Sequence, residues 1–202
     1  MDTATIKTPT VSGTPFGGGF YAGRIRINDD IFAIIVAPKA TEIEMPWNES
    51  SRSIPATSFF DGAANTKAMA MAQAGSDLAQ HIQGLDINGF SDWYLPSRDE
   101  LELCYRNLKP SAHQNYCYRG DNPSSVPPGY AYARDLPAQT NDAAFQDGGE
   151  EAFELAWYWT STQGAGNPDY AWVQLFDDGG QFTSYKSNTY RARAVRRLLV
   201  IE

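Results

Sequence analysis

The chain has 202 residues, which is enough to bury one hydrophobic core, so we expect one main domain. Its formal net charge of −8 excludes a sequence-independent grip on nucleic acid or an anionic membrane, since both need positive surface. The apolar content is 42%, yet no apolar run reaches the length of about 18 residues that predicts a transmembrane helix.

The N-terminal segment, residues 1–18, is rich in threonine and glycine and has little to bury. We expect a flexible arm or a connection to another subunit there, followed by a single domain over residues 19–202. The first residues lack a basic stretch followed by an apolar one, so the sequence predicts no secretory signal.

Two apolar segments, residues 20–27 and 31–37, flank the polar turn at Asn28-Asp29-Asp30 and predict a β-hairpin. The second segment is apolar on both faces, which is typical of an internal strand. We expect this hairpin and the last strand of the chain to share one sheet.

Two helices are predicted next. Asp61 is a candidate N-cap for the first, and Gly84 follows its last periodic position. Its apolar stripe consists of Ala68, Met71, Ala72, Gly75, Leu78, Ala79 and Ile82. Ser97 and Glu100 form a capping box at the start of the second helix, and Pro110 ends it. Residues 93–95 before that helix are predicted to be extended.

The segment from residue 109 to 154 has no periodicity and is rich in turn-forming and acidic residues. A loop of this length inside a domain tends to be functional. The last third of the chain, from Trp157, has short aromatic and β-branched runs separated by turns. With Asp178-Gly179 as a hairpin signal, it predicts a β-meander that ends in a long apolar strand.

Catalytic patterns are weak. Cys104 and Cys117 are too few for a disulfide framework, and a reduced pair is the favoured interpretation. A hydrolase using Cys117 with His113, or the acidic residues between 142 and 154, remains an alternative. Cys104, His113 and Cys117 are a weak match to any zinc pattern because their spacing is irregular, and Asp177 and Asp178 are better explained by a turn. We therefore expect no enzyme, no metal and no cofactor.

The late loops have the composition of a recognition surface. Aromatic residues make up 13% of the chain, and tyrosine, asparagine and threonine are concentrated near its end. Such side chains combine ring stacking with adaptable hydrogen bonds. The predicted ligand-binding residues are Gln163, Asn167, Asp169, Tyr170, Gln181, Thr183, Tyr185, Lys186, Asn188 and Tyr190.

An ordered set of motifs resembles a known family. The set comprises Asp92-Trp93-Tyr94-Leu95-Pro96-Ser97 with Glu100-Leu101, then Tyr158-Trp159-Thr160-Ser161-Thr162, Ala171-Trp172, and Arg193-x-Val195-Arg196. It is similar to the C-terminal domain of a bacterial collagen-like adhesin, which also occurs in phage tail-associated proteins. Tyr94, Ser97 and Thr160 depart from the usual arginine, threonine and serine. The resemblance covers roughly residues 20–201.

The resemblance implies an α+β, C-type-lectin-like fold: a small antiparallel sheet, two helices and a long loop region. It implies a non-enzymatic binding domain, often trimeric, such as a phage tail-fibre or receptor-binding protein that recognises a host cell-surface glycan or protein. The N-terminal arm would then join other tail or virion proteins, and the protein would reside in the virion, or in the bacterial cytoplasm before assembly. The alternatives are a variable protein of a diversity-generating retroelement and a structural virion subunit.

Overall fold

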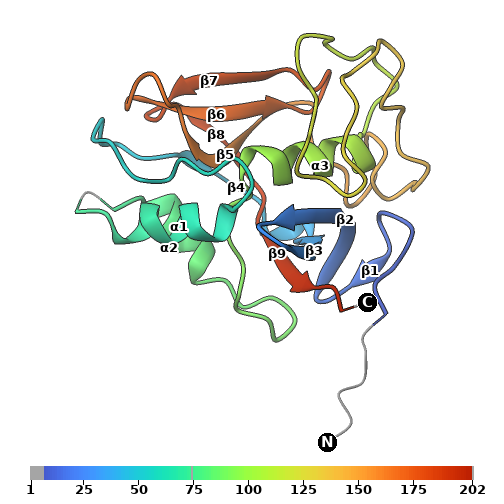
Figure 1. The fold of residues 1–202 in the computed structure, drawn as a ribbon, viewed down its shortest axis with the longest axis horizontal. Coiled ribbons are helices and arrows are strands. Elements are labelled where there is room, and N and C mark those ends of the chain that lie inside the picture. The colour runs from blue at the N-terminus through green and yellow to red at the C-terminus, as the bar shows by residue number, and fades with distance from the viewer. Residues whose placement is uncertain (1–6, 74, 202) are drawn as a thin grey trace, which may run out of the picture.

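Two β-sheets lie on opposite sides of one helix, α3 (Arg98–Leu108), in the computed structural model, which describes residues 7–73 and 75–201 (Figure 1). The lower sheet has the order β1-β2-β3-β9, with β1 (Pro15–Phe16), β2 (Gly19–Ile27), β3 (Asp30–Val36) and β9 (Val195–Leu199). The upper sheet has the order β4-β8-β5-β6-β7, with β4 (Ile43–Pro46), β8 (Thr189–Ala192), β5 (Trp157–Gln163), β6 (Tyr170–Leu175) and β7 (Gln181–Tyr185). Together with three α-helices, these sheets confirm the predicted α+β class.

The lower sheet confirms the predicted hairpin and its partner strand. β2 and β3 pair in antiparallel fashion around Asn28, which has the positive φ of 55° that a tight turn requires. β3 lies between β2 and β9, so its residues from Ala33 to Val36 are fully buried. The last strand of the chain therefore completes the sheet that the first hairpin begins.

The predicted arm is partly folded onto this sheet. β1 pairs with β2, and the Thr8 hydroxyl accepts a hydrogen bond of 2.9 Å from Arg24. The Gly13 N–H donates to the Tyr21 carbonyl over 2.8 Å. The structure therefore places the described part of the arm from Thr8 onward against the domain, while residues 1–6 lie outside the described residues.

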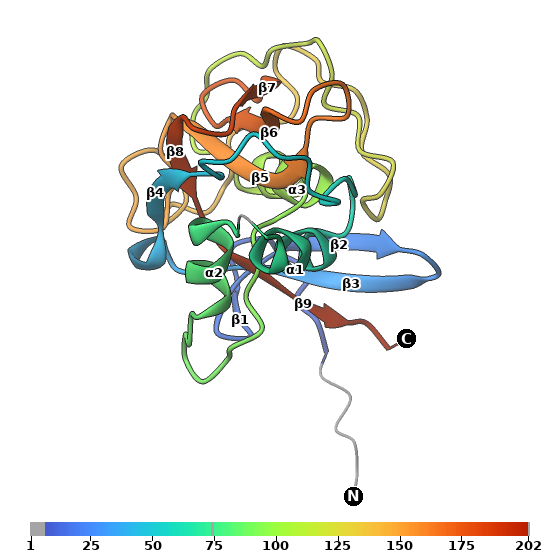
Figure 2. The same ribbon diagram turned by 90° about the vertical axis from the view of Figure 1, so that its left-hand side faces the viewer.

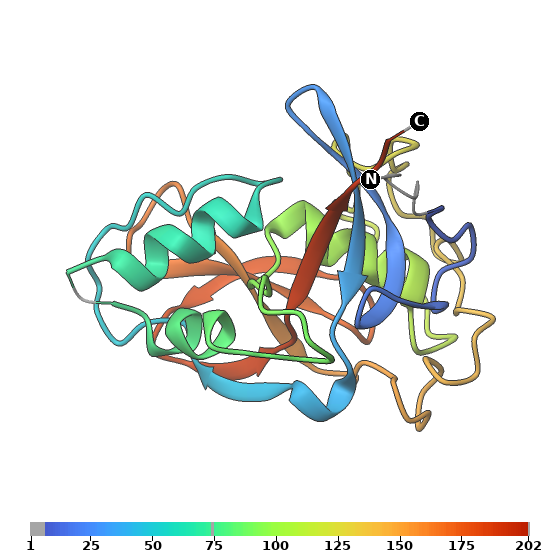
Figure 3. The ribbon, with the colours of Figure 1, turned by 90° about the horizontal axis from the view of Figure 1, so that it is seen from below.

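The first predicted helix is two helices, α1 (Gly62–Met71) and α2 (Asp77–Gln83), which lie side by side (Figures 2 and 3). Asp61 caps α1 and Gly84 ends α2, as predicted. The single-helix prediction is wrong because buried Ser76 caps a new helix: its hydroxyl accepts from the Ala79 N–H. Leu78, Ala79 and Ile82 of the predicted apolar stripe are buried, but Met71 is 74% exposed and Met69 is buried instead, so the predicted stripe is wrong for α1.

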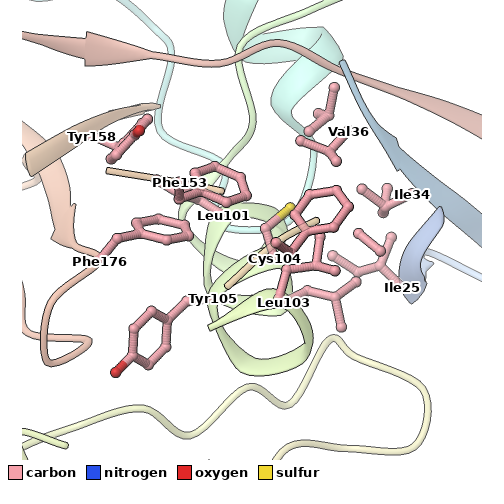
Figure 4. Packing of buried hydrophobic residues seen from close by; sticks show 14 of the residues in the cluster. Ile25, Ile34, Val36, Leu101, Leu103, Cys104, Tyr105, Phe153, Tyr158 and Phe176 are labelled. Atoms are coloured by element: carbon pink, nitrogen blue, oxygen red, sulfur yellow. The ribbon is translucent and has the colours of Figure 1, made fainter. Parts of the chain in front are cut away.

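The second predicted helix is α3, and its capping box is confirmed. The Ser97 hydroxyl accepts from the Glu100 N–H, and the Glu100 carboxylate accepts from the Ser97 N–H over 2.7 Å. The extended segment before it forms one isolated bridge, between Tyr94 and Val195. In Figure 4, Leu101 and Cys104 of α3 pack among Ile25 and Ile34 of the lower sheet and aromatic rings near the upper sheet.

The long loop between α3 and β5 contains no helix or strand among its described residues, as predicted. Side-chain hydrogen bonds hold it in place. Buried Lys109 donates to Asn115 Oδ1 over 2.9 Å, and Asn122 donates to Glu102 Oε2 over 2.6 Å. A further 3-10 turn, η1 (Lys39–Thr41), precedes β4.

The predicted meander is confirmed as β5, β6 and β7, with Gly179 at a φ of 78° in the turn between the last two. The predicted terminal strand is shorter than expected. Arg193 and Ala194 separate β8 from β9, which belong to different sheets. Within the described ranges, no helix has the length and apolarity needed to cross a membrane.

Candidate ligand-binding groove

The ends of β5, β6 and β7 position an open groove. In β6, Trp172 lies directly opposite Thr183 of β7, and alternation places both side chains on one face of the sheet. Phe59, from the irregular segment before α1, meets the Trp172 ring edge-on at a centroid distance of 5.9 Å. The segment before α1 thus forms one side of the groove, and the sheet forms the other.

We call this the aromatic groove, a hollow of about 340 Å³ lined by Phe59, Gly164, Ala165, Gly166, Asn167, Tyr170, Trp172 and Thr183. Three aromatic rings supply stacking surface, and the asparagine and threonine supply hydrogen-bonding groups. The small residues at 164–166 leave the groove open between these walls. Apolar walls with a few polar groups are the usual composition of a ligand site.

Two guanidinium groups lie over the rings of the groove. Arg98 stands 4.4 Å from the Phe59 centroid, and Arg119 stands 5.2 Å from that of Trp172. Both distances are within the range of cation–π attraction. Arg98 is ion-paired with Asp99 at 2.9 Å, whereas exposed Arg119 has no ion pair within the described residues.

A second hollow, of about 660 Å³, is lined in part by Phe59 and Arg98. It is lined by polar and apolar residues, among them Ser58, Asn65 and Ser124. Because Phe59 belongs to both hollows, a long ligand bound in one would pass over its ring to the other.

Three of the ten predicted ligand-binding residues, Asn167, Tyr170 and Thr183, line the aromatic groove. Tyr185 lies beside it, with its ring centroid 4.4 Å from that of Tyr170. Hydrogen bonding between these two residues raises the pKa of Tyr170 above its usual value. Tyr185 and the half-buried Asp169 line a separate small cavity of about 100 Å³.

Three other predicted residues, Gln163, Gln181 and Lys186, are buried. The Lys186 amine donates to Gln163 Oε1 over 2.7 Å and to the Arg52 carbonyl over 3.1 Å, next to the Trp47 ring. Burial lowers the pKa of Lys186 to about 8. The structure thus buries these three side chains, a position that sequence alone did not reveal.

The last two predicted residues, Asn188 and Tyr190, lie on the face opposite the groove. Both hydrogen-bond with the Ser184 hydroxyl, and the Tyr190 ring packs on Trp159 at 4.9 Å. The predicted ligand-binding residues did not include Phe59, Trp172 and Arg119. An aromatic pair in the irregular segment, Phe59-Phe60, was the available signal for this wall of the groove.

The groups considered for catalysis have structural partners. His113 Nδ1 contacts Asp177 rather than Cys117, and the Cys117 thiol donates to the Asn115 carbonyl. Glu151 binds Arg193, and Glu154 binds Lys39. Cys104 and Cys117 are both free. No group of three or more potential metal-ligating side chains occurs in the part of the chain that was described.

Comparison with protein families gives one match. Residues 41–196 match the family model described as the Lcl C-terminal domain. No curated protein sequence matches the chain. The family match spans most of the 202 residues, so the chain belongs to the Lcl C-terminal domain family, which is tied to phage proteins and to variable proteins of diversity-generating retroelements. The matched range, residues 41–196, also includes every residue that lines the aromatic groove.

Proposed function

We propose that this member of the Lcl C-terminal domain family is a non-enzymatic binding domain whose ligand occupies the aromatic groove. The observation that carries the proposal is the convergence of Phe59, Tyr170 and Trp172 around an open hollow. Exposed aromatic rings beside hydrogen-bonding groups bind sugars and protein surfaces alike. Among the described residues that line the aromatic groove there is no carboxylate, histidine, lysine or cysteine.

The biological setting forms part of the same proposal. The chain would act in a phage tail fibre or receptor-binding protein and recognise a glycan or protein on the host cell surface. It would work as a homo-oligomer, with a trimer as the first expectation, and its N-terminal residues would join other tail or virion proteins. The protein would then be found in the virion, or in the bacterial cytoplasm before assembly.

A binding assay tests the proposal. Purified protein is labelled and applied to host cells and to an array of cell-surface glycans. Phe59→Ala and Tyr170→Ala should lower binding about fivefold or more, since each removes a stacking ring worth about 1 kcal/mol or more. Tyr130→Ala is the matched control, because Tyr130 is an exposed ring outside the groove that lies over Arg106.

Binding that is unchanged in both groove variants would reject the aromatic groove as the site. Turnover of a bound glycan, seen as shortened or modified product, would reject the non-enzymatic assignment.

A further inference from the structure

The outer edge of β7 is free. β7 is the last strand of the upper sheet and, among the strands of the described ranges, pairs only with β6 (Figure 1). Hydrogen bonds from Leu175 to Gly180 and from Lys186 to Asp169 bracket this pairing. Because main-chain groups alternate in direction along an antiparallel ladder, those of Phe182 and Ser184 point to β6 and those of Thr183 point outward.

The outward main-chain groups of Thr183 have no protein partner in the part of the chain that the structure describes, whereas the outward Tyr185 carbonyl accepts a hydrogen bond from the Asn188 N–H over 2.9 Å. Within the described residues, neither the N–H nor the carbonyl oxygen of Thr183 has a hydrogen-bond partner, and the residue is exposed. The neighbouring outward residue Tyr185 is 53% exposed. A free strand edge is a template for another extended chain, which would pair with these groups.

Side chains on both faces of the sheet border this edge. On one face, Thr183 and Trp172 belong to the aromatic groove. On the opposite face, exposed Phe182 lies 5.6 Å from Tyr116, measured between ring centroids. An added strand presents its side chains alternately to the two faces, so it would meet aromatic surface on each.

A positively charged side chain, Arg119, lies near the middle of the β7 edge. Arg119 lies over Trp172, directly across from Thr183, and has no ion pair within the described chain. Its φ of 119° is rare for any residue except glycine, and such backbone strain is concentrated at functional sites. Asp169 lies at one end of β7, where its main-chain carbonyl accepts a hydrogen bond from the Lys186 N–H over 2.9 Å.

We propose that the ligand of the aromatic groove is an extended acidic peptide segment of a partner protein, added as a strand to the free edge of β7. This inference rests on the proposed binding function and specifies its ligand class. A peptide strand supplies both the donor and the acceptor that the Thr183 main chain lacks, and an acidic side chain supplies the partner of Arg119. Alternate side chains of the segment enter the groove.

The probe is a displayed library of random linear peptides of about ten residues, which is long enough for one strand. The full chain should enrich peptides that carry Asp or Glu next to apolar residues. In parallel, the glycan array is probed with the same preparation. Selected peptides are then synthesised with and without N-methyl groups at alternate residues, since N-methylation removes the donors that pair with a strand edge.

Two variants of Thr183 distinguish the contribution of its main-chain N–H to binding from that of its side chain. Thr183→Pro removes the outward N–H and none of the bonds to β6, whereas Thr183→Val keeps the N–H and loses only the hydroxyl. We expect Thr183→Pro to bind about tenfold more weakly than Thr183→Val, and peptide N-methylation to weaken binding about tenfold. Arg119→Gln should weaken acidic peptides by about tenfold and leave their Gln-substituted versions unaffected.

Peptide binding that tolerates N-methylation would overturn the strand-addition proposal, a result that does not depend on the folding of any variant. If the protein binds glycans but no peptides, and Phe59→Ala abolishes the glycan binding, the ligand is not a peptide. That result would overturn this inference and leave the proposed function standing. Failure of peptides, glycans and host cells to bind at all would reject the proposed function together with this inference.

Discussion

Arg193 donates hydrogen bonds to both the carboxylate and the main-chain oxygen of Glu151, over 2.7 and 2.8 Å. The Arg193 side chain is fully buried, and its guanidinium lies 4.6 Å from the Phe153 centroid. Its Nε–H donates to the Ala37 carbonyl next to β3. One buried cation thus fastens the long loop to the segment where the chain passes from the upper to the lower sheet.

Replacing this cation should be strongly destabilising. Arg193→Met removes the cation paired with the Glu151 carboxylate, which keeps only the Lys39 N–H as a donor, and it removes the side-chain donor of the Ala37 and Glu151 carbonyl oxygens. The free energy of unfolding should therefore fall by about 3–5 kcal/mol. Urea denaturation measures this change. Lys39→Met is the control, because it breaks the exposed pair with Glu154 on the same loop and should cost about 1 kcal/mol or less. Equal losses in the two variants would contradict a special role for Arg193.

Glu100 should make stability depend on pH. Burial raises the pKa of Glu100 from 4.5 to about 7, against the opposing effect of hydrogen bonds from Ser97 and Tyr94. The folded state therefore holds this proton more tightly than the unfolded state. The resulting stabilisation is complete below pH 4.5 and is lost as the pH rises to 7, by about 3 kcal/mol in total.

Glu100→Gln should remove most of this dependence, because glutamine stays neutral and its amide oxygen can still accept from the Ser97 N–H. Urea denaturation at several pH values between 4 and 8 gives the slope for each protein. Burial also raises the pKa of Glu42 and Glu102, so the informative quantity is the difference between the two proteins. Parallel curves would show that Glu100 does not titrate in this window.

Two asparagines distinguish the groove from the opposite face. Asn167 lines the aromatic groove and accepts a hydrogen bond from the Asp169 N–H, whereas Asn188 donates to Ser184 on the other side of the sheet. Asn167→Ala should lower affinity for the selected ligand about threefold to tenfold, and Asn188→Ala should leave it unchanged. Surface plasmon resonance with each variant measures both. The reverse order would move the site to the opposite face.

The backbone strain at Arg119 should be visible in stability. Both Arg119→Gly and Arg119→Ala remove the charge, but only glycine adopts a φ of 119° without strain. The glycine variant should therefore be the more stable of the two by about 1 kcal/mol. At Arg134, an exposed residue of the same loop with an ordinary φ, alanine should be the more stable replacement. Thermal unfolding of the four variants measures which replacement is the more stable at each position.

Local signals carried much of the fold prediction. The Ser97 and Glu100 capping box, the turn at Asn28 and the turn at Gly179 each depend on a few neighbouring residues, and all three are confirmed. The break between α1 and α2 was missed because Ser76 acts through a distant partner as well: its hydroxyl also donates to the Trp47 carbonyl. Periodicity contains no information about such a contact.

The groove was only partly predictable for the same reason. Tyr170 and Thr183 lie on strands of the meander, so their neighbourhood follows from local pairing. Phe59 and Arg119 reach Trp172 from segments far apart in the chain. Lys186 has the composition expected of a contact residue, yet it is buried because the loop containing Arg52 covers it.

The two-residue link at Arg193 and Ala194 has a consequence for synthesis of the chain. The lower sheet needs β9 beside β3, and the upper sheet needs β8 between β4 and β5. Both strands leave the ribosome after everything they pair with, so neither layer can be completed cotranslationally until the last segment emerges. Closure of the two layers is therefore a late, long-range event, which sets a slow folding rate for a domain of this size.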